Sequence, residues 1–376
     1  MTLAAEVVRG RLVLPESVTP GRVTIEDGWI TAIEPDPAQA WGPYVAPGFI
    51  DIHVHGWGGH DATGDADALS GMARALLRQG VTTFLPTAPS LSESAIPAFA
   101  ERVRQWMPRA PADGAEPLGF NLEGPLLAPS RRGAHDPRVL RTPEQFDRAV
   151  LDEASNGLRV ITIAPELPGA LGLIERLTAD GVIVSIGHSA ATLEQAQAGY
   201  RAGARSTTHL FNAMTGVDHR APGLAVAALT NDEVYAELIA DGIHVHPSLW
   251  LIITRMKGPD HLLLVSDALP LAGTGDGTGS VAGLAVEVRG GRATLAGSDT
   301  LAGSVIALDT AVRNLAGAGA SLPRAVKAAS SNPAALLGHA DRGRIEVGRR
   351  AHLVQLGEDL RVLRVTRGAG WIEGQA

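Results

Sequence analysis

The chain contains no cysteine, which excludes disulfides, thiolate metal ligands and cysteine nucleophiles. Lysine is almost absent, since Lys257 and Lys327 are the only two and arginine supplies the other cations. Aromatic residues make up 4% of the 376 residues, so aliphatic side chains and alanine must build the core. No apolar stretch reaches the ~18 residues that a membrane-spanning helix needs.

Further absences bear on location and partners. The first residues lack a basic start followed by a long apolar run, so we expect no signal peptide and a cytoplasmic location. The formal net charge of −8 argues against nucleic acid or an anionic membrane as a partner, because both select basic surfaces. A local basic pocket for one phosphate is still compatible with this charge.

Both ends of the chain have the pattern of short strands. Residues 1–46 alternate β-branched and polar residues around a turn at Asp27-Gly28, and residues 341–376 show a similar pattern. Neither end alone can bury one face of a sheet. The sequence therefore predicts one small, discontinuous β-sandwich domain from 1–46 and 341–376, beside a larger domain over 47–340.

The middle of the chain alternates short apolar runs with helical segments. Such runs are typical of parallel strands buried on both faces, and eight of them favour a (β/α)8 barrel over an open sheet. Thr142 with Gln145, and Thr192 with Gln195, predict helix starts through capping boxes. The eight runs are 44–55, 81–88, 118–125, 159–166, 182–189, 206–213, 236–245 and 261–268.

In such barrels the active site lies at the carboxyl ends of the strands. Titratable and polar residues gather at those ends here, which predicts a catalytic rim. In strand order, these residues are His53 and His55, Thr87, Glu123, Glu166, His188, His209, Asp241 with His244, and Asp267.

Glu123, His188 and His209 lie at three of these strand ends. One carboxylate and two imidazoles form a suitable ligand set for a divalent metal, with a position left for water. Asp267 ends the eighth run, where its carboxylate could take a proton from that water. A single histidine is more often a hydrogen-bonded core residue, but the grouping at one rim favours the metal.

His53 and His55 are two residues apart in a strand, so both should project to the side that Asp51 shares, with Cα atoms roughly 6–7 Å apart. Ile50, Ile52 and Val54 should take the other side. The residues alone leave two interpretations open: the two histidines hold a second metal, or they hydrogen-bond to ligands of the first. Neither lysine is near a strand end, so any bridge between two metals must be a carboxylate, and Glu123 is the candidate.

Other residues near the rim are candidates for substrate binding. Asn212 and Arg220 follow His209, and with His244 they could form a phosphate site, although Arg220 alone is more typical of a solvated surface residue. His135 lies on the loop after the third strand, within reach of a metal. The glycine-rich segment 271–280 lacks the order of a phosphate-binding loop and is more typical of a loop or hairpin turn.

At this point the motifs resemble a known family. "PGFIDIHVHG", "NPAALLG" and "GRIEVGRRAHLV" are similar to the amidohydrolase superfamily, although His352 stands where that superfamily usually has aspartate. "NLEGPLLAPSRRGAH", "GHSAAT", "THLFNAM", "ELIADGIHV", "LVSDA" and "LAGS" more closely resemble the N-acetylglucosamine-6-phosphate deacetylases, in order from about residue 45 to 350.

The resemblance implies a role for each matching residue. It implies a primary metal at Glu123, His188 and His209, and a second at His53 and His55, because family members that keep this His-x-His can bind one. It implies one or two divalent metals per chain, with zinc first and iron, manganese or cobalt as alternatives. It also implies a homodimer, because a neighbouring subunit can complete the phosphate site. The implied catalytic residues are Asp267 as acid–base and His135 at the acetyl carbonyl; the implied substrate contacts are Asn212, the Ala213 backbone, Arg220, His244 and Leu301.

We therefore expect hydrolysis of N-acetyl-D-glucosamine 6-phosphate, an amino-sugar phosphate, to D-glucosamine 6-phosphate and acetate. The same reaction on N-acetylgalactosamine 6-phosphate differs by the orientation of one hydroxyl, which the sequence does not reveal. A base deaminase and a non-catalytic scaffold on the same fold are the remaining alternatives.

Overall fold

The structure is a computed structural model that describes residues 5–375. Residues 1–4 and 376, which the predicted small β domain includes, lie outside the described residues.

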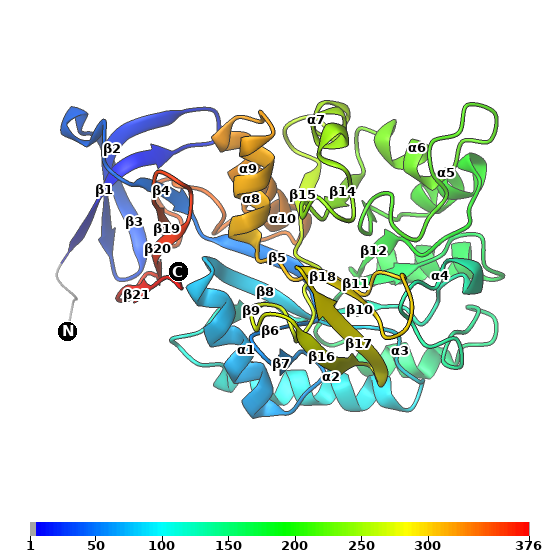
Figure 1. Cartoon of the computed structure of the whole chain (residues 1–376). Coiled ribbons are helices and arrows are strands. Elements are labelled where there is room, and N and C mark those ends of the chain that lie inside the picture. Colours follow the sequence, from blue (N-terminus) through cyan, green and yellow to red (C-terminus); the bar gives the residue numbers. More distant parts are fainter. Residues whose placement is uncertain (1–4, 376) are drawn as a thin grey trace.

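A seven-stranded sheet joins the two ends of the chain, and its blue and red strands lie side by side in Figure 1. The strand order is β21-β20-β19-β4-β1-β2-β3, so strands from the C-terminal end pair with β4 from the N-terminal end. Asp27 and Gly28 have φ angles of 48° and 81°, as a two-residue hairpin turn requires. The domain boundaries at 46/47 and 340/341 stay a prediction. The strands are β1 (Glu6–Val13), β2 (Val18–Glu26), β3 (Trp29–Pro35), β4 (Tyr44–Pro47), β19 (His352–Leu356), β20 (Val362–Arg367) and β21 (Ile372–Glu373).

The predicted barrel is confirmed, and all eight apolar runs contain parallel strands in chain order. Hydrogen bonds bring the first and last strands together at the rim, since Asp267 N–H donates to the His53 carbonyl and His55 N–H donates to the Ala268 carbonyl. These bonds place the end of the eighth strand beside the two histidines of the first. The barrel strands are β5 (Phe49–Val54), β8 (Val81–Ala88), β10 (Phe120–Glu123), β11 (Leu158–Ile163), β12 (Ile183–Ile186), β13 (Ser206–Thr207), β14 (Tyr235–Leu238) and β15 (Leu262–Leu264).

Helices cover the outside of the barrel, and one of the two predicted helix starts is confirmed. Thr192 and Gln195 form a capping box at the start of α5. The start at Thr142 is wrong: Gln145 does reach back to the Thr142 N–H, but Phe146 turns into the core and Asp147 caps the helix instead. The helices are α1 (Ala66–Arg78), α2 (Ala95–Trp106), α3 (Arg148–Ala154), α4 (Ala170–Ala179), α5 (Leu193–Arg201), α6 (Leu224–Leu229), α7 (Pro247–Met256), α8 (Leu308–Gly317), α9 (Leu322–Ala328) and α10 (Ser331–Leu336).

The alternation predicted for β5 is broken. Ile50 and Ile52 join a cluster with apolar side chains from strands around the barrel, which is possible only inside it. Val54 instead joins the larger cluster that the outer helices line. The pairing of β5 with β8 shifts between Asp51 and Val54, so these three side chains do not share one face.

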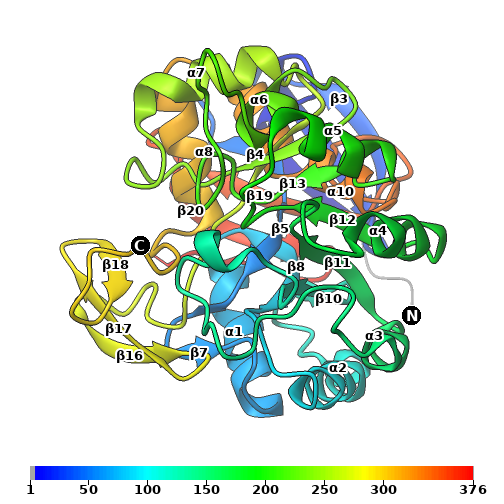
Figure 2. The same ribbon diagram turned by 90° about the vertical axis from the view of Figure 1, so that its right-hand side faces the viewer.

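A three-stranded antiparallel sheet follows the eighth barrel strand, and Figure 2 shows it projecting from one side of the barrel. The glycine-rich segment expected to be a loop or turn leads into its first strand, and a hairpin turn follows at Ala282-Gly283. Two even smaller strands, β6 and β7, pair with each other, and β9 adds to β8. The bounds are β6 (Gly56–Trp57), β7 (His60–Asp61), β9 (Glu116–Pro117), β16 (Gly277–Val281), β17 (Leu284–Arg289) and β18 (Arg292–Leu295). Within residues 5–375, no helix has both the length and the apolar character needed to cross a membrane.

Acid should destabilise this fold through His352, a buried residue of β19 that faces Glu116 of β9. Desolvation, together with the nearby Arg342 guanidinium, lowers the pKa of His352 to about 3. The folded state then excludes a proton that the unfolded chain binds below its pKa of about 6.5, so the free energy of unfolding falls between about pH 6.5 and 3. From pH 7 to 5 this one group should cost about 2 kcal/mol.

The measurement is urea unfolding at pH 7 and pH 5. The His352→Gln variant should lose less stability between these pH values than the parent chain. The matched variant His219→Gln, at an exposed position, should follow the parent. An equal loss in His352→Gln and in the parent would contradict the prediction.

Candidate metal centre and active site

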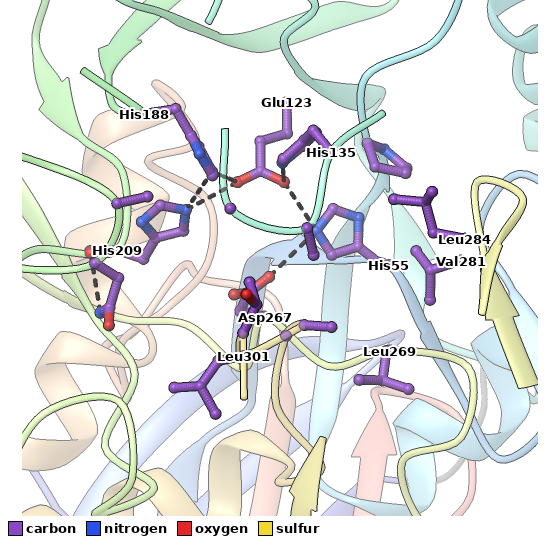
Figure 3. A pocket seen from close by; sticks show the side chains of 18 of the residues that line it. His55, Glu123, His135, His188, His209, Asp267, Leu269, Val281, Leu284 and Leu301 are labelled. Carbon is purple, nitrogen blue, oxygen red and sulfur yellow. Dashed lines mark hydrogen bonds and ion pairs between the residues drawn. The ribbon is translucent and has the colours of Figure 1, made fainter. Parts of the chain in front are cut away.

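Five imidazoles surround the carboxylate of Glu123 at the barrel rim. Figure 3 shows four of them, with Asp267 below the carboxylate. Glu123 is the last residue of β10 and is 4% exposed. The histidines come from three different strand ends and one loop, so only the closed barrel brings them together. The five are His53, His55, His135, His188 and His209.

One oxygen of Glu123 faces His188 and His209. Its Oε1 lies 3.0 Å from His188 Nε2 and 2.9 Å from His209 Nε2, and the two nitrogens are 3.0 Å apart. His188 Nδ1 donates to the Arg131 carbonyl at 2.8 Å, which turns the Nε2 lone pair toward Glu123 when the ring is neutral. Desolvation lowers the pKa of His188 to about 4, so this ring is neutral at pH 7. Three donor atoms thus converge as the ligands of one divalent metal do.

The other oxygen of Glu123 faces His55 and His135. Its Oε2 lies 3.2 Å from the Nε2 of each ring. His55 Nδ1 donates to the Thr87 carbonyl at 3.1 Å, which leaves Nε2 free to bind a cation. His135 differs, because its Nδ1 accepts the Ser90 backbone N–H at 3.1 Å. In a neutral ring the proton of His135 is therefore on Nε2, which makes it a hydrogen-bond donor rather than a metal ligand.

His53 approaches Glu123 with a ring nitrogen that has no hydrogen-bond partner in the described part of the chain. Its Nδ1 lies 3.0 Å from Glu237, whereas its Nε2 has no hydrogen-bond partner among residues 5–375. That Nε2 faces Glu123 Oε1 and Asp267 Oδ1, each at 3.5 Å. Ligand atoms of His53, His55 and Glu123 all lie within 4.8 Å of one another. The residues present therefore fit a cation at this position.

The electrostatic surroundings of His53 and His55 also favour a bound cation. Desolvation disfavours protonation of His53, but Glu123, Asp267 and Glu237 outweigh it and raise the pKa of His53 well above its ordinary value. Desolvation is likewise outweighed at His55, where hydrogen bonds to Asp267 and Glu123 raise the pKa to about 9. The surroundings of both rings thus favour a positive charge, which a proton or a metal ion can supply.

Three residues of the site have a left-handed backbone. The φ angles of His188, His209 and Asp267 are 45°, 27° and 49°, a region that side chains other than glycine rarely adopt. Each residue follows the end of its strand, where the turn aims its side chain into the pocket. Such strain costs on the order of 1–3 kcal/mol per residue and is concentrated at functional sites.

Asp267 lines the pocket and faces both His53 and His55. Its Oδ1 is 3.2 Å from His55 Nε2. Burial favours the neutral acid, but the positive field of His53 and the hydrogen bond from His55 lower the pKa of Asp267 to about 2. The carboxylate is therefore ionised at neutral pH and able to accept a proton.

A cavity of about 350 Å³ opens above this cluster, a size that suits a small ligand. Among the predicted substrate contacts, Asn212, Ala213, His244 and Leu301 line it. Arg220 does not line it within this chain and lies on an exposed loop. His244 Nδ1 donates to Asp241 at 2.7 Å, and this bond outweighs desolvation and lowers the pKa of Asp241.

One part of the cavity wall is apolar, and Leu301 is the one of its residues named below that the sequence had indicated. Figure 3 shows Val281, Leu284, Leu269 and Leu301 on the side of His55 and Asp267, away from His188. Val281 and Leu284 belong to β16 and β17, the small sheet beside the barrel. No pattern in the sequence connects that sheet to the rim.

The sequence also missed two polar residues behind the site, Glu237 and Ser90, which hold His53 and His135 as described above. Thr87, one of the predicted rim residues, holds His55 through its backbone carbonyl. Glu166, one of the predicted rim residues, accepts bonds from the Ser189 hydroxyl and the Ala190 N–H and so anchors the loop after His188. The available signal for Glu237 was a carboxylate within an otherwise apolar run.

Neither lysine approaches the site. Lys257 Nζ donates to the Ala228 and Asn231 carbonyls, and Lys327 Nζ pairs with Asp260 at 2.8 Å. This agrees with the prediction that a lysine cannot bridge two metals here.

Comparisons with known proteins agree on one family. A sequence model of the amidohydrolase family matches residues 44–368. The N-acetylgalactosamine-6-phosphate deacetylase of Escherichia coli O157:H7 is 38% identical over 98% of both chains. The human N-acetylglucosamine-6-phosphate deacetylase is also 38% identical, over 85% of this chain and 81% of its own. A variant of N-acetyl-D-glucosamine-6-phosphate deacetylase from Mycobacterium smegmatis, in complex with N-acetyl-D-glucosamine-6-phosphate, superposes with a TM-score of 0.90 and 34% identity over 98% of this chain and 99% of that one.

Proposed function

The chain belongs to the amidohydrolase family, and from this premise we propose that it hydrolyses N-acetyl-D-glucosamine 6-phosphate to D-glucosamine 6-phosphate and acetate. The observation that carries the proposal is Glu123, with imidazoles at both oxygens and the ionised Asp267 beside them, at the base of a ligand-sized cavity. The deacetylases named above supply the substrate class.

Glu123, His188 and His209 would hold the primary metal, and His53, His55 and Glu123 would hold the second. A divalent metal bound by Glu123, His188 and His209 would supply a water molecule of lowered pKa and would polarise the amide carbonyl. Imidazole and carboxylate ligands suit zinc, and also iron(II), manganese and cobalt. We propose zinc as the first choice because two histidines and a glutamate match the three protein ligands that catalytic zinc sites have.

Two residues of the chain carry the proton transfers. The Asp267 carboxylate takes a proton from the attacking water and then gives it to the departing amine nitrogen. The His135 Nε2–H, held in that tautomer by the Ser90 N–H, donates to the acetyl carbonyl oxygen as negative charge develops there. The bond that breaks is the C–N bond of the amide, and acetate and the free amine result.

The other end of the cavity takes the sugar phosphate. Asn212, the Ala213 backbone and His244 line the cavity and are the proposed contacts, with Leu301 against the sugar. Arg220 lies outside the cavity of its own chain. We therefore propose a homodimer in which Arg220 serves the site of the neighbouring copy. The cytoplasmic location stays a prediction.

Purified protein loaded with zinc should release acetate from both N-acetylhexosamine 6-phosphates. We expect kcat/KM to be higher for the gluco epimer by about tenfold or more, because a buried polar group left without its hydroxyl is costly. N-acetylgalactosamine 6-phosphate is the second candidate, favoured by the Escherichia coli relative that matches the whole chain. A higher kcat/KM for that epimer would reassign the substrate, and release of ammonia from a base instead of acetate would indicate a deaminase.

A further inference from the structure

Glu237 lies inside the barrel, and the mechanism above does not use it. It belongs to β14 and is 1% exposed. Tyr235 and Ile239, two residues away on either side, both pack into the cluster that fills the barrel interior. The period of two along a strand turns the Glu237 carboxylate to the same side. A carboxylate buried there requires partners, because an unpaired buried charge is costly.

Its partners belong to both proposed metal positions. Glu237 Oε2 lies 3.0 Å from His53 Nδ1 and 3.0 Å from the His209 backbone nitrogen. The backbone carbonyl of Glu237 also accepts the Leu210 N–H at 2.8 Å. One residue of β14 therefore holds the side chain of His53 on β5 and the backbone that carries His209.

The bond to His53 decides which ring nitrogen carries the proton and which one, facing Glu123 and Asp267, keeps a lone pair. An ionised carboxylate can only accept, so His53 Nδ1 carries the proton and Nε2 keeps a lone pair when the ring is neutral. That Nε2 is one of the buried side-chain atoms for which residues 5–375 provide no hydrogen-bond partner. A carboxylate behind a ligand histidine orients the ring and raises its basicity.

The bond to His209 acts on the backbone. His209 has a φ of 27°, so its peptide is strained just where the imidazole turns toward Glu123. The N–H donated to Glu237 fixes this peptide. It does not select the protonation of the His209 ring, and the two metal positions therefore depend on Glu237 in different ways.

We propose that Glu237 is a positioning residue that prepares His53 to bind the second metal and secondarily anchors His209 at the first. This inference rests on the metal positions assigned above. Replacing the carboxylate by an amide keeps the volume, and the amide oxygen should take the place of Oε2 because that atom must still accept the His209 N–H. A neutral oxygen accepts the bond from His53 Nδ1–H more weakly than a carboxylate does, which leaves His53 Nε2 a poorer metal ligand. The second metal should therefore be affected far more than the first.

The test is calorimetric titration of metal-free protein with Zn²⁺, together with metal content after dialysis. The parent chain should bind two Zn²⁺, and Glu237→Gln should raise the Kd of the weaker site by about 10–100-fold while the other site changes little. The control is Asp309→Asn, which also turns a buried carboxylate into an amide but one that pairs with Arg313 on α8 rather than with an imidazole, and it should titrate like the parent.

A spectroscopic measurement separates positioning from loss of structure. In zinc-loaded protein the Nδ1–H of His53 should give a low-field proton resonance, identified by its absence in His53→Ala, and Glu237→Gln should shift it to higher field. An unchanged Kd in Glu237→Gln, an unshifted resonance, or a parent chain that binds a single Zn²⁺ would each overturn the inference. Acetate release by the parent is assayed separately, so a chain that binds two Zn²⁺ but releases no acetate would overturn the proposed function alone.

Discussion

Asp267→Asn should lower kcat for acetate release by about 10³-fold or more, because the amide can neither take a proton from water nor return one to the amine. The parent carboxylate is ionised at neutral pH, since its pKa of about 2 is held down by His53 and His55 against desolvation. Asparagine has nearly the same shape, so the bonds of the Asp267 backbone to His53 and Ser304 should survive.

Metal analysis accompanies the kinetics of this variant. Metal content should stay at the parent value, which distinguishes loss of the proton carrier from loss of the metal. Asp309→Asn is the matched control, because Asp309 is also a buried carboxylate but pairs with Arg313 on α8, and it should keep the parent kcat. An Asp267→Asn protein with more than a tenth of the parent activity would contradict the proposed mechanism.

The double variant His53→Ala/His55→Ala should lose one of two metals per chain and keep the other. The two removed rings face Glu123 and Asp267, whereas His188, His209 and Glu123 Oε1 remain in place for the primary metal. Elemental analysis of the purified protein measures this directly. We expect about half of the parent metal content.

Glu123→Gln provides the contrast for this experiment. It weakens both positions at once, because the Glu123 carboxylate faces His188 and His209 as well as His53 and His55, and it should leave little metal. Unchanged metal content in the double variant would contradict the second metal. His53 and His55 would then only hydrogen-bond to ligands of the first metal, which is the alternative that the sequence had left open.

The barrel itself could be predicted from the sequence because its signal is local. Each buried parallel strand is a short apolar run, and a polar residue at the end of each run marks the rim. The same local signal located Asp27-Gly28 and the capping box of Thr192. The same signal gave a wrong helix start at Thr142. The predicted bond from the Thr142 N–H to Gln145 is present, but Phe146 is buried and the helix begins only after it.

Predictions that required a particular pairing between strands were less successful. The alternation along β5 placed Val54 with Ile50 and Ile52, but a shift in the pairing with β8 separates them. Such a shift depends on the neighbouring strand and leaves no mark in the residues of β5. The sheet β16–β18 and the apolar wall it adds to the cavity were also missed, because no pattern in the sequence connects that sheet to the rim.

The sequence by itself determined the kinds of chemistry available: with no cysteine and no lysine at a strand end, the metal ligands had to be histidine and carboxylate. It also determined that these residues would lie at one rim, because all parallel strands of a barrel end there. Only the tertiary structure decided which imidazoles face each oxygen of Glu123 and which ring nitrogens carry a proton. The two oxygens of Glu123 face different imidazoles, Ser90 makes His135 a donor, and Glu237 frees the Nε2 of His53. These assignments depend on hydrogen bonds between segments far apart in the chain, and such bonds exist only once the barrel has closed.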